Sequence, residues 1–184
     1  QGFNYSVVDM SMNGGLGRVI EKNNLLLRDS SEKISAVLSD CQSEEIWVIT
    51  YSVSNAFTTQ PFNGNEFNTF YAFKVSGDGV DTNPQISGPF TSVDDPRGYL
   101  KFSPDGTKLA CANATDGLFL YDFDSNTGIV SNEFPININF SPPNPLKRQD
   151  PYGLEFSPNN QFLYVSAAYN PTQVEINNPN EQYS

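Results

Sequence analysis

The chain has 184 residues, the size of one ordinary domain or of a large part of a repeat protein. Its 21 acidic and 10 basic residues give a net charge of −11, which disfavours a nucleic-acid backbone as partner. The sequence contains no histidine, which excludes His-based catalytic triads, Cys–His dyads and HExxH metal sites. Aromatic residues make up 13%, enough to build a core.

A strand-like motif that ends in a glycine-bearing turn occurs three times. Its copies are YSVVDM from Tyr5, FYAFKV from Phe70 and LFLYDF from Leu118, followed by the turns NGG, GDG and NTG. Alternating apolar residues before such a turn are typical of a β-hairpin. We therefore expect a returning strand after each turn, at 24–28, 85–90 and 136–140, and a weaker copy of the motif at 172–177.

A second motif combines a short strand with a proline turn. GYLKFSPDG from Gly98 matches YGLEFSPNN from Tyr152, and ISAVLSD from Ile34 is a weaker copy. Proline presets φ for the turn, and Asp-Gly or Asn-Asn accepts the positive φ that follows. We expect the phenylalanine of each strong copy to be buried between neighbouring repeats. The residues of this predicted core are Phe102, Phe156, Trp47, Leu100 and Leu154.

Together the two motifs form a unit of four short strands per roughly 50 residues, which is typical of a β-propeller blade. The predicted fold is all-β, with four-stranded antiparallel blades. About three blade-equivalents fit the chain, and a closed ring needs four to eight. We therefore expect a partial propeller, completed by the remainder of the same polypeptide or by a second chain. The predicted full blades span 34–90 and 98–140, with the end of one blade at 5–31 and the start of another at 152–177.

The ordered set of motifs resembles a known family. The segments are NYSVVDMSMNGGLGRV, EKISAVLSD with IWVITYS, FYAFKVSGDGVDTNP, GYLKFSPDGTKLACAN, LFLYDFDSNTGIVSN and YGLEFSPNNQFLYVS. They resemble the WD40-like propeller repeats of large secreted flavobacterial and other Bacteroidetes surface proteins, over about residues 4 to 170. The family often has a histidine soon after the tryptophan strand, where this chain has Tyr51 and Ser52.

The resemblance implies an extracellular or cell-surface location. In that family the propeller precedes adhesion-type modules and a C-terminal sorting domain read by the type IX secretion system, and gliding motility is one of the associated roles. The function it implies is a non-catalytic interaction or adhesion module that binds a protein or glycan. The alternative is a propeller enzyme of the lactonase or hydrolase type with a site in the central channel. The scattered acidic residues favour the first reading, and we assign no catalytic residue and no organic cofactor.

Two sets of residues are candidate sites. The first is a calcium loop of the D-x-D-x-N type at Asp122, Asp124, Asn126 and Glu133, for which the alternative is a plain hairpin turn. The second is the insertion at 52–68, whose aromatic residues form either a contact surface or a loop folded on itself: Phe57, Phe62 and Phe67.

The two cysteines, Cys41 and Cys111, are expected to be unpaired thiols. Apolar runs in the chain are strand-sized, far below the roughly 20 residues of a membrane-spanning helix.

Overall fold

A computed structural model describes residues 2–40, 42, 44–58, 66–138 and 147–171, and gives the main chain alone for 147–149 and 168–171. Within these ranges the chain forms antiparallel strands and turns, and the one helical element is a 3-10 turn, η1 (Asn13–Gly15). The prediction of an all-β chain is confirmed.

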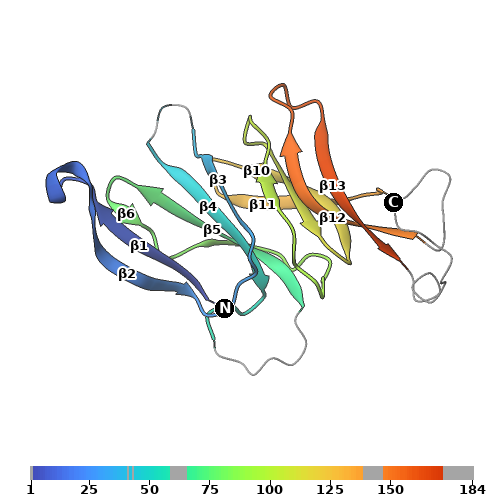
Figure 1. The fold of residues 1–184 in the computed structure, drawn as a ribbon, viewed down its shortest axis with the longest axis horizontal. Coiled ribbons are helices and arrows are strands. Elements are labelled where there is room, and N and C mark those ends of the chain that lie inside the picture. The colour runs from blue at the N-terminus through green and yellow to red at the C-terminus, as the bar shows by residue number, and fades with distance from the viewer. Residues whose placement is uncertain (1, 41, 43, 59–65, 139–146, 172–184) are drawn as a thin grey trace.

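The strands form four sheets that follow one another along the chain, as Figure 1 shows from blue to red. Sheet A is the hairpin of β1 (Phe3–Asp9) and β2 (Arg18–Leu27). Sheet B consists of β3 (Ile34–Leu38), β4 (Ile46–Val53) and β5 (Phe67–Ser76), and the far edge of β5 pairs with β6 (Gly79–Val80) and β7 (Gln85–Ser87). Sheet C consists of β8 (Leu100–Phe102), β9 (Lys108–Asn113), β10 (Gly117–Asp124) and β11 (Ile129–Ile136). Sheet D is the hairpin of β12 (Lys147–Phe156) and β13 (Leu163–Pro171).

Of the three predicted returning strands, the one at 85–90 is present over 85–87 as β7, and the other two differ in where they start. The strand expected at 24–28 is longer and starts at Arg18, because the glycine-rich loop lets the chain turn back early and pair Val8 with Val19. The strand expected at 136–140 is misplaced. β11 starts at Ile129, directly after a turn closed by a 2.7 Å hydrogen bond from the Gly128 N–H to the Asp124 carbonyl. The copy expected at 172–177 lies outside the described residues.

Both faces of the two central sheets are buried. Along β5, Phe70 and Ala72 belong to the core between sheets B and C, whereas Tyr71 and Phe73 belong to the core between sheets A and B. Successive strand residues point to opposite faces, so this alternation places one apolar side chain on each neighbouring sheet. In β9 the run LACA divides in the same way, and Ala110 and Ala112 face the core between sheets C and D. Three apolar layers therefore join the four sheets in chain order.

The predicted core residues are buried. Phe102 and Leu100 lie with Trp47 in the layer between sheets B and C, and the Phe102 ring packs 4.8 Å from that of Phe123. Leu154 and Phe156 lie in the layer between sheets C and D. The prediction that the two repeat phenylalanines pack between successive sheets is confirmed.

The two proline turns have the same hydrogen-bond network. In the first turn Ser103 Oγ donates to Asp105 Oδ1 (2.6 Å) and accepts from the Lys108 N–H (2.9 Å). In the second, Ser157 Oγ donates to Asn159 Oδ1 (2.7 Å), and the N–H of the residue five positions on donates to it (2.9 Å). The turn glycine of the first copy has φ +72° and the matching asparagine of the second has φ +59°. The similarity in sequence is therefore a similarity in structure.

Strands β3, β8 and β12 are each the first strand of their sheet, and they lie next to one another. We call this row of three edge strands the leading edge. At one end of these strands, an added Cβ on Gly106 would lie 3.0 Å from Val37, and the Asp105 N–H donates to Asn160 Oδ1 (3.3 Å). At the other end, the Tyr99 N–H donates to the Tyr152 carbonyl (2.7 Å). Equivalent strand ends of three sheets therefore meet on the same two rims.

Candidate functional site

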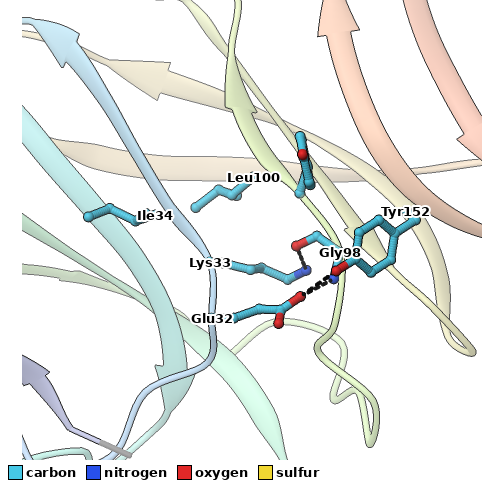
Figure 2. A pocket seen from close by; sticks show the side chains of 7 residues that line it. Glu32, Lys33, Ile34, Gly98, Leu100 and Tyr152 are labelled. Carbon is cyan, nitrogen blue, oxygen red and sulfur yellow. Dashed lines mark hydrogen bonds between the residues drawn. The ribbon is translucent and has the colours of Figure 1, made fainter.

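A cavity of about 350 Å³ opens where the starts of β3 and β8 meet β12 (Figure 2). Three sheets contribute to its wall, which therefore exists only when those sheets are packed together. Its lining residues are Glu32, Lys33, Ile34, Gly98, Tyr99, Leu100 and Tyr152. We call it the leading-edge pocket.

The cation of this pocket is buried. Lys33 is 2% exposed, and its Nζ donates to the main-chain carbonyl of Gly98 (2.8 Å) and to that of Ala112. Both acceptors are neutral carbonyls, and among the described residues no carboxylate forms a hydrogen bond or ion pair with this ammonium. Burial lowers the pKa of Lys33, because removal from water disfavours the charged form.

Gly98 lets the main chains of the sheets approach closely. Its φ is +121°, and an added Cβ would lie 2.7 Å from the Ala112 carbonyl oxygen. A side chain is therefore excluded here, and the Gly98 carbonyl stays within reach of Lys33. The N–H of the same residue donates to Glu32 Oε1 (3.1 Å), so one glycine holds both charged side chains.

The anion of the pocket is the exposed carboxylate of Glu32. Its Oε1 accepts the Gly98 N–H and the hydroxyl of Tyr152 (3.3 Å), and Figure 2 shows its side chain pointing from the start of β3 toward both. The negative charge raises the pKa of Tyr152. Arg97 interacts electrostatically with the Glu32 carboxylate. Its hydrogen bonds go to Asp95 instead, from Nε (2.7 Å) and from a terminal nitrogen. Within the described part of the chain, Glu32 has no ion-pair partner.

Two tyrosine rings form the aromatic wall. Tyr99 is 55% exposed and Tyr152 is 45% exposed, and their ring centroids lie 5.8 Å apart at an interplanar angle of 54°. Exposed aromatic faces beside a fixed carboxylate can hold a ligand by stacking, by cation–π attraction and by hydrogen bonds. The arrangement is suited to binding, because two hydrogen bonds fix Oε1 of Glu32 while the faces of both tyrosine rings remain partly exposed.

The calcium hypothesis is not supported, because the structure does not bring its four residues together. Asp122 binds Lys108 and the amide of Asn132 (2.7 Å), whereas Glu133 binds Thr91 and the Tyr121 hydroxyl (3.3 Å). Tyr121 and Asp122 are successive strand residues, so their partners lie on opposite faces of sheet C.

The other two residues of that hypothesis form a turn. Asp124 Oδ1 accepts the Asn126 N–H (3.0 Å) and Oδ2 accepts the Thr127 hydroxyl (2.8 Å). These bonds form a hairpin turn, the alternative to a calcium loop that the sequence left open. Across the described residues, no group of three or more Cys, Asp or Glu is placed to hold a metal ion.

The predicted aromatic loop is divided by the structure. Phe67 is only 6% exposed, because it belongs to β5 and packs against the Tyr51 ring at 6.4 Å, so its assignment to a contact surface was wrong. Phe57 is 42% exposed and meets the Tyr71 ring edge-on at 5.6 Å. Phe62 lies outside the described residues.

A second cavity, of about 280 Å³, lies at the other side of the interface between sheets B and C. Trp47 contributes to its wall, but the ring is buried beneath Lys74, whose Nζ lies 5.0 Å from the ring centroid. The Trp47 Nε1 donates to the Ser125 carbonyl (2.6 Å). No aromatic face is therefore open here. The remaining lining residues are Asp81, Asn83, Gln85, Asn126 and Thr127.

Cys111 is a free, fully buried thiol, and burial raises its pKa. This agrees with the predicted unpaired state, and Cys41 lies outside the described residues. In the parts of the chain with described structure, there is no helix of the length and apolarity needed to cross a membrane.

No family model matches the chain, and no curated protein matches it significantly.

The pocket residues were not among the predicted site residues. Tyr99 and Tyr152 both lie in the repeat motif that precedes the proline turn, and Glu32 and Lys33 directly precede its weaker copy. The aligned repeats carry part of this signal, because Ile34, Gly98 and Tyr152 occupy the same position in their copies and all line the pocket. Tyr99 stands one position later in its copy than Tyr152 does in the next, so the alignment does not pair the two tyrosines.

Proposed function

We propose that the chain is a non-catalytic interaction module that binds its ligand at the leading-edge pocket. The observation that supports this most is the exposed pair of tyrosine rings beside the Glu32 carboxylate, which has no ion-pair partner in the described structure. The Gly98 N–H and the Tyr152 hydroxyl hold Oε1 of Glu32 in place, and both tyrosine rings keep about half of their surface exposed.

We further propose that the sheets are successive blades of a WD40-like propeller. Three observations support this: the buried faces of both central sheets, the matching proline turns, and the adjacent leading strands β3, β8 and β12. In a propeller the first strands of all blades surround a central channel, so the leading-edge pocket would lie at the mouth of that channel.

Completion of the ring would cover the outer faces of sheets A and D. The outer face of sheet A exposes Val8 and Leu25, and sheet D exposes Tyr164. Met10 and Phe162, which directly flank β1 and β13, are exposed as well. Apolar side chains on two such faces support the proposal that further blades, from the same polypeptide or a second chain, pack against them. The proposed cell-surface location, with a role in adhesion or gliding, rests on the resemblance of the repeats.

The test separates binding from catalysis. Immobilised protein is screened with soluble glycans and short peptides, and hydrolysis of lactones, esters and glycosides is assayed in parallel. We expect at least one ligand whose binding is lost in Tyr99→Ala and kept in Tyr164→Ala, which removes an equally exposed tyrosine from sheet D. Turnover that disappears in Glu32→Gln would overturn the proposal in favour of the propeller-enzyme alternative.

A further inference from the structure

We propose that the leading-edge pocket binds a cationic side chain, the guanidinium or ammonium group of a basic peptide segment. This inference rests on the proposed interaction function and adds the chemical class of the ligand. Three features of the pocket support it: a fixed carboxylate, two aromatic faces and an inaccessible resident cation.

The carboxylate of Glu32 is oriented before any ligand arrives. Its Oε1 is held by the Gly98 N–H and the Tyr152 hydroxyl, and within the described structure its Oε2 has no hydrogen-bond partner. The ion pairs of the described residues join other groups, including Arg97 with Asp95. A cationic ligand would therefore find an acceptor without first breaking an ion pair, and charge-assisted hydrogen bonds are the strongest available to it.

The aromatic wall suits the same ligand. Tyr99 and Tyr152 present faces at a 54° angle with centroids 5.8 Å apart, so a flat guanidinium can lie on one ring while its edge meets the carboxylate. Cations are attracted to such faces within about 6 Å of the ring centroid. The net charge of −11 adds a long-range attraction for a basic partner.

An anionic ligand is disfavoured by the position of Lys33. Its ammonium is buried and donates to two main-chain carbonyls, so an anion would have to displace those bonds and pass the Glu32 carboxylate. A glycan would use the tyrosine faces too, but it gains most from several neutral donors and acceptors. The amide side chains of that kind lie in the second cavity, not in this one.

The test uses two peptides that differ in charge alone. Acetyl-Gly-Arg-Gly-amide and the same peptide with citrulline, the neutral isostere of arginine, are titrated calorimetrically into the 184-residue chain. We expect the arginine peptide to bind at least about tenfold more tightly, and more weakly as salt is added. In Glu32→Gln the preference for arginine should disappear, whereas Glu45→Gln, which removes a carboxylate paired with Lys74, should keep it.

Other results have distinct meanings. Equal binding of the two peptides, or a preference that survives Glu32→Gln, would overturn the inference. If neither peptide binds but a glycan binds and is lost in Tyr99→Ala, the interaction function stands and the cationic ligand is wrong. If no ligand depends on Tyr99, both proposals fail. The exposed ring of Tyr99 makes this variant informative even if Glu32→Gln does not fold.

Discussion

The ammonium group of Lys33 lies 2.8 Å from the carbonyl oxygen of Gly98, across the interface between sheets B and C. This bond ties the start of β3 to the start of β8 and places a charge inside the leading edge. The carbonyls of Gly98 and Ala112 would be left without this donor if the ammonium were removed.

We predict that Lys33→Ala lowers the free energy of unfolding by about 2–4 kcal/mol, because it opens a void and removes a donor from two carbonyls. Lys101→Ala is the control, since it breaks only an exposed ion pair with Glu155 and should cost less than about 1 kcal/mol. Chemical denaturation of both variants measures the difference. Equal losses would show that the buried ammonium has no structural role.

The same lysine predicts a pH dependence. Because burial lowers the pKa of Lys33 from its ordinary 10.5, the unfolded chain holds this proton more tightly than the folded chain does. The cost of burying the charge is fully present below the lowered pKa, and it is relieved as the pH rises from that value toward 10.5. The stability of the wild type relative to Lys33→Met should therefore increase with pH in this window. A difference that falls with pH would contradict the account.

Alkaline conditions above pH about 10 should destabilise the chain through its buried tyrosines. Desolvation raises the pKa of Tyr51 and of Tyr121, and the Tyr51 hydroxyl donates to the Phe67 carbonyl (2.8 Å). These groups keep their protons in the folded state, so stability is fully present below the ordinary tyrosine pKa and is lost as the pH rises above it. Tyrosinate absorbance should rise in two stages, first from the exposed tyrosines and then at unfolding. A single early stage that includes every tyrosine would argue against their burial.

Gly128→Ala should destabilise sheet C at its contact with Trp47. The added Cβ would lie 2.8 Å from the Trp47 ring, closer than packed carbon atoms approach, and the residue has φ +76°. Overpacking of this kind costs about 1–3 kcal/mol, in addition to the strain of the positive φ. Gly14→Ala is the matched control, because its φ is +66° and nothing lies within 4 Å. Equal shifts of the denaturant midpoint in both variants would show that the contact with Trp47 has no effect on stability.

Phe102→Ala should lower the free energy of unfolding by about 3–5 kcal/mol, as expected for a buried aromatic ring. Its ring fills the layer between sheets B and C beside Phe123. Phe57→Ala removes a ring that is 42% exposed and should have a much smaller effect. Urea titrations of the two variants are compared at the same pH and temperature, and an unchanged midpoint for Phe102→Ala would refute its place in the core.

Local chemistry explains which parts of the fold could be predicted. The Ser-Pro-Asp-Gly turn closes by bonds within five residues, from Ser103 to Lys108, so a short motif determines it. Strand alternation likewise predicts which residues are buried, as for Phe102. The start of β11 was missed because the turn is short: Asp124 already pairs with Ile129 across it. The longer loop that was expected does not form.

The site is formed by residues that are far apart in sequence, so no local sequence pattern predicts it. Glu32 is 66 residues from Gly98 and 120 from Tyr152 along the chain, yet it bonds to both. The four calcium candidates are separated for a related reason: the spacing of Asp122 and Glu133 in sequence does not tell which face of the sheet each occupies. Packing of whole sheets decides the first question, and the register of β10 with β11 decides the second.

The most direct test of the account is a two-dimensional ¹⁵N NMR titration of the chain with acetyl-Gly-Arg-Gly-amide. We predict that the largest shifts fall on the amides of Glu32, Gly98, Tyr99 and Tyr152, which come from three segments far apart in sequence that meet only where sheets B, C and D pack together. Shifts centred on Phe57, or scattered over the chain without these amides, would contradict it.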